Sequence, residues 1–204
     1  MAELSKGLRM VLSKPKVYDL FQRLMGSDKA YKEFSKIYIT PKSGDRILDV
    51  GCGTATILKY LKYIEYVGID INTDYINVAR EKYGELGLFI CDTGESNVIE
   101  GLAPFDTVLM MGVAHHLDND SLSNTFSMIK KVLKDNGKLI TIDPTFTPDQ
   151  NLFAKLLIKL DRGLNVRSPE EYFNIANSIF SRIKIQVSHK KFIPYTHCII
   201  SCRK

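Results

Sequence analysis

The stretch Ile47-Leu48-Asp49-Val50-Gly51-Cys52-Gly53-Thr54-Ala55 decides the fold of this chain. Its apolar first half predicts a buried strand, and its two glycines predict a tight loop where that strand turns into a helix. Gly51 and Gly53 let a ligand approach the backbone closely, and the helix behind them would offer unpaired N–H groups at its start. These features are shared by many nucleotide-binding sites, so they do not identify the ligand.

Two carboxylates narrow the choice of ligand. Asp49 stands just before the glycines, where it would repel a pyrophosphate but suits an ammonium group. Asp70 ends the next expected strand, about 20 residues beyond the glycines, where an acid binds ribose hydroxyls. Thr56 occupies the place of the third glycine of a dinucleotide site. A ligand with a ribose and an amino acid but no phosphate, such as S-adenosylmethionine, fits both acids. Helix capping is the alternative role for them.

Strands and helices alternate through the middle of the chain. We expect strands at residues 46–50, 66–71, 88–92, 107–111 and 138–143, and helices at 54–63, 74–83 and 120–133. This alternation predicts a doubly wound parallel sheet with helices on both faces. Two β-rich runs, 183–187 and 196–202, predict a hairpin at one edge of the sheet.

Helical segments flank this core. Ser13-Lys14-Pro15 predicts a helix start near the N-terminus, a second helix is expected at 29–38, another should follow Pro148, and Ser168-Pro169-Glu170-Glu171 forms a capping box. We expect residues 1–204 to form a single domain. Its expected parts are an N-terminal helical cap (1–44), a cofactor-binding core (45–145), a helical insertion that caps the substrate (146–182) and a β-hairpin (183–204).

Composition excludes several classes of protein. The 28 Lys and Arg exceed the 23 Asp and Glu by a net charge of +5, but they are spread along the chain, which does not favour a nucleic-acid partner. The four cysteines show neither CxxC nor zinc-ligand spacing, so we expect reduced thiols and no metal. No apolar run is long enough for a membrane span. These observations favour a cytoplasmic protein.

The motif from Arg46 to Thr54 resembles the first motif of class I S-adenosylmethionine-dependent methyltransferases, close to the small-molecule enzymes of ubiquinone and menaquinone biosynthesis. Gly68-Ile69-Asp70 resembles the acid that ends their second strand, and Cys91-Asp92-Thr93 resembles their adenine-binding acid and its neighbour. Ala55 departs from the family, which usually has a third glycine there. This change should narrow the loop without abolishing binding.

The resemblance continues in the same order along the chain. Phe105-Asp106-Thr107-Val108 followed by His115-His116-Leu117 is similar to the family's fourth strand and the loop behind it, and residues 133–139 to its fifth strand. The similarity covers residues 45–145. It implies a Rossmann-like, doubly wound, mostly parallel seven-stranded sheet with a C-terminal antiparallel hairpin and a helical cap.

The same resemblance implies the cofactor and its contacts. The cofactor would be S-adenosylmethionine, with S-adenosylhomocysteine as product and no metal. The implied binding residues are Asp49, Gly51, Cys52, Gly53, Asp70, Ile71, Asp92, Thr93, Met111, Gly112 and His116. Alternatively, Asp92 is only an acid in the turn after a strand, and the cysteines only pack in the core.

Candidates for catalysis and substrate binding follow from their positions. His115 would take a proton from the acceptor, since His116 holds the position that usually packs inward in the family; packing or lining of the cofactor pocket is the alternative. Asp143 ends the fifth expected strand and would orient a nucleophile, unless it is only a turn acid before Pro144. The candidates for substrate lining, with packing as their alternative role, are Tyr18, Phe21, Arg162, Arg167 and Tyr172.

The predicted reaction is in-line transfer of a methyl group to a small-molecule acceptor, in which the protein supplies positioning, exclusion of water and, where needed, removal of one proton. Three other functions stay open at this point. They are methylation of RNA, a nicotinamide-dependent dehydrogenase, and a non-catalytic partner subunit that keeps the same fold.

Overall fold

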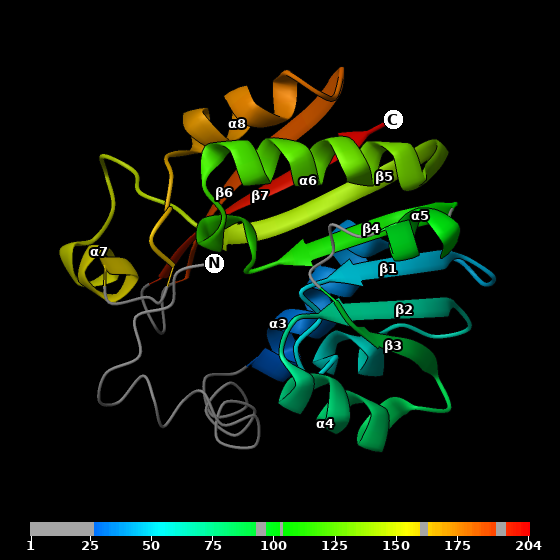
Figure 1. The fold of residues 1–204 in the computed structure, drawn as a ribbon. Coiled ribbons are helices and arrows are strands. Elements are labelled where there is room, and N and C mark those ends of the chain that lie inside the picture. The colour runs from blue at the N-terminus through cyan, green and yellow to red at the C-terminus, as the bar shows by residue number, and fades with distance from the viewer. Residues whose placement is uncertain (1–26, 93–96, 103, 160–162, 191–194) are drawn as a thin grey trace.

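The computed structural model describes residues 27–92, 97–102, 104–159, 163–190 and 195–204 (Figure 1). Seven strands form one sheet in the order β3-β2-β1-β4-β5-β7-β6. They are β1 (Arg46–Val50), β2 (Glu65–Asp70), β3 (Gly87–Cys91), β4 (Phe105–Met111), β5 (Leu133–Pro144), β6 (Arg182–Lys190) and β7 (Tyr195–Arg203). Strands β1 to β5 are parallel, whereas β7 runs antiparallel to both β5 and β6. The predicted mostly parallel sheet with a C-terminal hairpin is confirmed.

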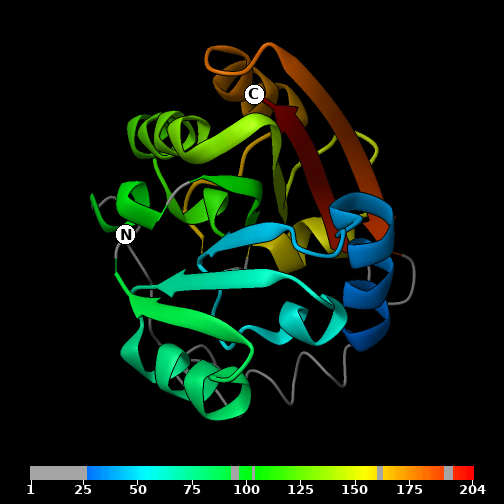
Figure 2. The ribbon, with the colours of Figure 1, turned by 90° about the vertical axis from the view of Figure 1, so that its right-hand side faces the viewer.

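Helices cover both faces of the sheet. The helical elements are α3 (Ser27–Phe34), η1 (Ser35–Ile39), η2 (Thr56–Tyr60), α4 (Thr73–Tyr83), α5 (Asn97–Leu102), η3 (Ala114–His116), α6 (Asn119–Val132), α7 (Leu152–Lys159) and α8 (Pro169–Asn177). Phe126 of α6 and Tyr172 of α8 belong to one buried cluster, and Ile39 of η1 and Ile76 of α4 belong to another. Figure 2 shows α6 and α3 on opposite sides of the strands. The sheet is therefore doubly wound, as predicted.

The helix expected at 54–63 is wrong in extent and type. Only one 3-10 turn, η2, forms there. Ala55 before it and Tyr63 after it both adopt positive φ, 55° and 57°, and Leu61 is already extended. A residue in the left-handed conformation cannot continue an α-helix, and one stands before η2 and another after it. The glycine loop is therefore not followed by the long α-helix that the sequence suggested.

The bounds of other elements also differ from the expected ones. The helix expected at 29–38 begins at Ser27, and its last five residues form the π-helical turn η1. β5 begins at Leu133, directly after α6, and runs through the expected turn at 135–137, where Asn136 has a φ of 64°. Helix α5 was not among the expected elements. The helix expected near Ser13 lies outside the described residues, while the capping box of α8 is present as predicted.

The register brings the candidate site together. Val50 pairs with Ile69, Asp70 with Cys91, and Met111 with Ile142, so the carboxyl ends of β1 to β5 lie at one end of the sheet. Ligands of doubly wound sheets bind at this end. In the described residues, no helix has both the length and the apolar character that a membrane crossing would need.

Candidate functional site

The glycine loop is held over the end of β2. The backbone N–H groups of Gly51 and Cys52 both donate to the carbonyl of Ile69, at 2.7 and 3.0 Å. Gly51 has a φ of 72°, and a Cβ added there would lie 2.3 Å from Cγ2 of Val113. Gly53 has a φ of 55°, but a Cβ added there would meet nothing within 4 Å. Gly51 is thus fixed by both conformation and close packing, and Gly53 by conformation alone.

Ala55 has the backbone conformation of the glycine that it replaces. Its φ and ψ are 55° and 33°, in the left-handed region, and its N–H donates to the carbonyl of Cys52 at 2.9 Å. This conformation costs a residue with a Cβ about 1–2 kcal/mol. The methyl group is fully buried in the cluster that contains Ile57 and Leu58. The loop therefore keeps the geometry that a glycine would give it, and the methyl group fills the core below it.

Asp70, at the end of β2, ties the glycine loop to the start of the segment that follows β2. Its Oδ2 accepts from the N–H of Gly53 at 2.9 Å, and its Oδ1 accepts from the N–H of Asn72 at 2.8 Å. The N–H of Asp92 donates to the backbone carbonyl of Asp70 at 3.0 Å. Ile71, next along the chain, is exposed. The structure thus brings these predicted residues together; Thr93 lies outside the described residues.

Asp49 is fully buried below the loop. Its Oδ2 accepts from the hydroxyl of Tyr66 at 2.7 Å, while its Oδ1 has no hydrogen-bond partner among the described residues. Burial raises the pKa of Asp49 to about 7; the bond from Tyr66 lowers it, and the charge of Asp70 raises it further. A buried carboxylate oxygen that lacks a donor fits an ammonium ligand, so this residue suits the amino-acid part of S-adenosylmethionine.

Sequence reasoning missed Tyr66, because its contact with Asp49 depends on how β1 and β2 pair. Asp49 pairs in register with Gly68, and a Cβ added to Gly68 would lie 2.9 Å from the Sγ of Cys52 and 3.1 Å from Cε1 of Tyr66. A glycine beside a buried acid therefore leaves room for an aromatic ring two residues earlier on the same strand. Cys52 is partly buried, and desolvation raises the pKa of its thiol. This favours packing over reactivity for Cys52.

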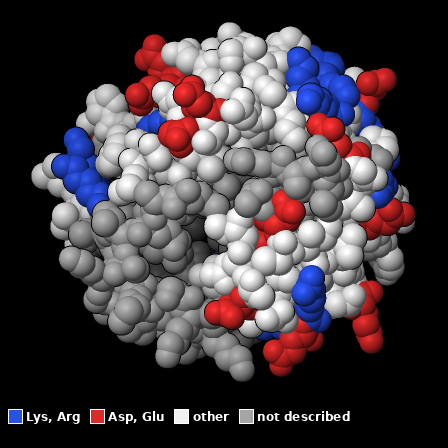
Figure 3. All heavy atoms as spheres, viewed as in Figure 1, with Lys and Arg blue, Asp and Glu red and all other residues white. Residues whose placement is uncertain are grey.

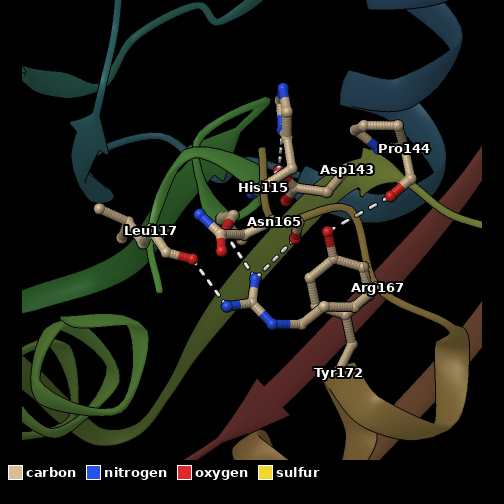
Figure 4. Close-up of polar contacts among 8 residues, drawn as sticks. His115, Leu117, Asp143, Pro144, Asn165, Arg167 and Tyr172 are labelled. Atoms are coloured by element: carbon tan, nitrogen blue, oxygen red, sulfur yellow. Dashed lines mark hydrogen bonds and ion pairs between the residues drawn. The ribbon is translucent and has the colours of Figure 1, made fainter. Parts of the chain in front are cut away.

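His115 and Asp143 form a buried pair at the ends of β4 and β5. Nδ1 of His115 lies 2.8 Å from Oδ1 of Asp143, and the His115 backbone N–H donates to the same oxygen at 3.2 Å (Figure 4). Their relative exposures are only 4% and 1%. An ionised Asp143 can only accept, so it places the ring proton on Nδ1 and leaves Nε2 as the basic nitrogen.

Two glycines make room for the imidazole of His115. A Cβ added to Gly163 would lie 1.9 Å from Cδ2 of the ring, and one added to Gly112 would lie 3.8 Å from Cε1. Asn165 also donates its N–H to the carbonyl of His115 at 2.9 Å. Because Cδ2 and Cε1 flank Nε2, the glycines border the edge of the ring that carries this nitrogen. Gly163 and Asn165 gave no sequence signal that we recognised.

The remaining cofactor candidates lie around this pair. The ring of His116 is 4.1 Å from that of His115 between centroids. The Gly112 N–H donates to the carbonyl of Ile142 at 2.8 Å, which joins the ends of β4 and β5, and Met111 packs against the second core cluster. Among the residues that the structure describes, no group of three or more His, Cys, Asp or Glu could hold a metal ion.

The described substrate candidates have structural contacts. Arg167 is buried and donates to the carbonyls of Ala114, Asn165 and Leu117 at 3.0, 2.9 and 2.7 Å (Figure 4). It also donates to Oδ1 of Asn119 at 2.9 Å. The hydroxyl of Tyr172 donates to the carbonyl of Pro144 at 3.3 Å, and burial raises its pKa. Arg167 thus fastens the insertion to the loop after β4.

The other three candidates, Tyr18, Phe21 and Arg162, lie outside the described residues. Figure 3 shows that acidic and basic side chains are scattered over the described part of this face.

Residues 48–139 match the family model described as a methyltransferase domain. An uncharacterized methyltransferase of Schizosaccharomyces pombe is 30% identical over 138 residues, which make up 62% of this chain and 47% of that protein. An uncharacterized methyltransferase of Oceanobacillus iheyensis is 22% identical over 187 residues, or 87% of this chain and 86% of that protein. This chain thus spans about half of one relative and most of the other.

The fold has solved counterparts. The crystal structure of an S-adenosylmethionine-dependent methyltransferase from Archaeoglobus fulgidus superposes with a TM-score of 0.74 at 21% identity, and the alignment covers 92% of this chain and 99% of that one. The two findings agree on the core that holds the glycine loop. Residues 48–139 are therefore similar to a methyltransferase domain, and the described chain shares the fold of the solved S-adenosylmethionine-dependent methyltransferase from Archaeoglobus fulgidus.

Proposed function

We propose that this protein transfers a methyl group from S-adenosylmethionine to a small-molecule acceptor. The observation that carries the proposal is the buried Oδ1 of Asp49, which has no donor in the described structure and lies beneath the glycine loop that Asp70 holds in place. Bound S-adenosylmethionine supplies a methyl group already activated by its sulfonium. The protein therefore has to bind, orient and exclude water.

Each acid takes one part of the cofactor. Asp49 binds the ammonium of the amino-acid moiety, and the carboxylate of Asp70 binds the ribose hydroxyls while it keeps its bonds to Gly53 and Asn72. A carboxylate oxygen has two lone pairs, so one oxygen can accept from a backbone N–H group and from a hydroxyl at the same time. Asp92 binds on the adenine side. The glycine loop permits close approach of the backbone.

His115 removes a proton from the acceptor through Nε2. Asp143 holds Nδ1 at 2.8 Å, which fixes the tautomer and favours the imidazolium that forms when the proton is taken. Asp143 is a positioning residue in this scheme. The support for it is the burial of both side chains and the two glycines that border the Nε2 edge.

The enclosure of His115 favours a small acceptor. The imidazole is nearly inaccessible, and the backbone at Gly163 lies directly against it. Residues 146–182 act as the substrate cap, fastened beside His115 by Arg167. The resemblance of the first motif to small-molecule methyltransferases of ubiquinone and menaquinone biosynthesis is consistent with an acceptor of this size.

Calorimetry with S-adenosylhomocysteine tests the cofactor assignment. We expect the wild-type protein to bind it, and we expect Asp70→Asn to weaken binding by about 10-fold or more, because a charge-assisted hydrogen bond contributes about 1.5–3 kcal/mol. Asp74→Asn, four residues further on and exposed, is the matched control and should bind like the wild type. Absence of binding by the wild type, combined with a thermal shift by NAD, would instead indicate a dehydrogenase.

The acceptor class is tested with S-adenosylmethionine that carries a radioactive methyl group. Cell extract incubated with the protein should acquire label in the fraction of small molecules, and His115→Gln should abolish this label while it retains binding of S-adenosylhomocysteine. Label found in the precipitated RNA instead would contradict a small-molecule acceptor.

A further inference from the structure

One apolar side of helix α7 is not covered by the described residues. Leu152, Phe153 and Leu156 are 83%, 56% and 51% exposed, whereas Ala154 and Ile158 on the other side of the helix are buried. α7 packs against β7 through this buried side. A short helix that is apolar on both sides has a second surface to cover, because single exposed apolar residues are ordinary but a contiguous group on one helix is not.

Lysines border the uncovered side. In a helix, residues three or four apart lie next to each other, so exposed Lys155 is adjacent to Leu152 and exposed Lys159 is adjacent to Leu156. The sequence of α7, Leu-Phe-Ala-Lys-Leu-Leu-Ile-Lys, contains no acidic residue. The exposed side therefore combines large apolar groups with positive charges on long flexible stems.

The position of α7 links this surface to the candidate site. α7 begins eight residues after Pro144, which ends β5 one residue beyond Asp143. Figure 1 shows α7 beyond the end of the sheet toward which β1 and β4 point. α7 therefore lies at the same end of the sheet as the candidate site.

We propose that α7 docks the protein on the surface of an anionic lipid bilayer, with Leu152, Phe153 and Leu156 in the headgroup region and Lys155 and Lys159 on the lipid phosphates. Charge complementarity selects this occupant. A protein partner would need acidic groups matched to both lysines, whereas an anionic bilayer presents negative charge along its whole surface and accepts apolar side chains at the same depth. The proposal concerns where the protein binds and does not depend on methyl transfer.

Vesicle sedimentation tests the proposal on the full chain. The wild type should sediment with vesicles of equal parts phosphatidylcholine and phosphatidylglycerol, and at least 10-fold less with phosphatidylcholine alone. The triple variant Leu152→Ser, Phe153→Ser, Leu156→Ser and the double variant Lys155→Gln, Lys159→Gln should each lose at least 10-fold of the binding. Leu86→Ser with Leu88→Ser removes two other exposed leucines, 60% and 50% exposed, and should change nothing.

The fold and the cofactor site provide separate readouts. All variants should keep the thermal melting curve and the S-adenosylhomocysteine binding of the wild type, since the changed side chains are exposed. Failure of the wild type to sediment with anionic vesicles overturns the proposal. A triple variant that still sediments also overturns it. So does a wild type that is a dimer while the triple variant is a monomer, because α7 would then bind a second copy of the chain.

Discussion

At the scale of single residues, the Asp49–Tyr66 pair makes the folded state sensitive to pH. Burial raises the pKa of Asp49 to about 7, whereas an unfolded aspartate has a pKa of about 3.9. Between these values the folded state holds one more proton than the unfolded state. The free energy of unfolding therefore falls as the pH rises through this window.

Asp49→Asn should remove this dependence. Between about pH 5 and pH 7, the wild type should lose about 2–3 kcal/mol of unfolding free energy that the variant keeps. Each unit of pKa difference is worth about 1.4 kcal/mol. Urea unfolding without cofactor at several pH values measures it. Exposed Asp74→Asn serves as the control. Curves that stay parallel for Asp49→Asn and the wild type would rule out titration of Asp49 in this range.

Cofactor binding should have the opposite dependence on pH. An ammonium group beside Asp49 favours the ionised carboxylate, so affinity for S-adenosylhomocysteine should rise as the pH approaches 7 from below. The bond from Tyr66 lowers the Asp49 pKa, and Tyr66→Phe should move the rise to higher pH. Calorimetry in two buffers with different ionisation enthalpies would detect the released proton. Equal heats in both buffers would show that Asp49 does not titrate on binding.

Gly51 and Gly53 separate conformational strain from steric overlap. Gly53→Ala should cost only the left-handed conformation, about 1–2 kcal/mol of unfolding free energy, since nothing lies within 4 Å of its added Cβ. Gly51→Ala should cost clearly more because its Cβ would lie 2.3 Å from Val113. Adding Val113→Ala should recover part of the Gly51→Ala loss and none of the Gly53→Ala loss. Denaturant unfolding of the two glycine variants, each with and without Val113→Ala, measures these losses. Equal losses of unfolding free energy at both glycines would contradict the packing argument.

At the scale of elements, Arg167 joins the insertion to the loop after β4. Its four hydrogen bonds reach Ala114, Leu117, Asn119 and Asn165, so one side chain connects segments that no strand pairing joins. Substitution leaves several buried carbonyls without a donor, and each unsatisfied group costs about 1–3 kcal/mol.

Arg167→Met should therefore lower the free energy of unfolding by about 3 kcal/mol or more, whereas Tyr172→Phe, which loses one bond to Pro144, should cost about 1 kcal/mol. Limited proteolysis should also cut Arg167→Met faster around residues 163–168. The reference is Arg182→Met, whose guanidinium is exposed and bonds near the chain end. An Arg167→Met protein as stable as Tyr172→Phe would show that the fastening is weak.

Local sequence signals predicted some elements well and others poorly. β1 matches its expected bounds, and the capping box of Ser168 and Glu171 is formed as expected, because both depend on neighbouring residues. The turn η2 departs from expectation because Ala55 is held in a left-handed conformation by the loop before it. β5 begins earlier than expected because Leu133 already pairs with Phe105 of β4, and the register shifts before Lys138 pairs with Thr107. Tertiary contacts decided both cases.

At the scale of the whole molecule, the mostly parallel sheet with its edge hairpin and the positions of the strand-end acids could be predicted, but the partners of these acids could not. Asp49 and Asp70 lie where the alternation of strands and helices puts them. Tyr66 and Gly163 act on Asp49 and His115 across the fold, from another strand and from the insertion. Such contacts depend on register and on packing between distant segments, which a local pattern does not contain.

Because one sheet connects the described elements, cofactor binding should stabilise them together. S-adenosylhomocysteine at about 100 times its dissociation constant should add about 2.7 kcal/mol to the free energy of unfolding. For a chain of 204 residues this corresponds to a rise in Tm of about 5–10 °C. Scanning calorimetry should show a single transition that moves as one. A second transition that stays in place would show that part of the chain unfolds independently of the site.

The placement of β7 between β5 and β6 has a consequence for the order of synthesis. The ribosome makes β6 first, yet β6 pairs with the sheet only through β7. Until β7 has emerged, β5 presents an open edge and β6 has no strand to join. The sheet of the nascent chain therefore stays incomplete until β7 has emerged. A chaperone that covers the open edge of β5 would act during this interval.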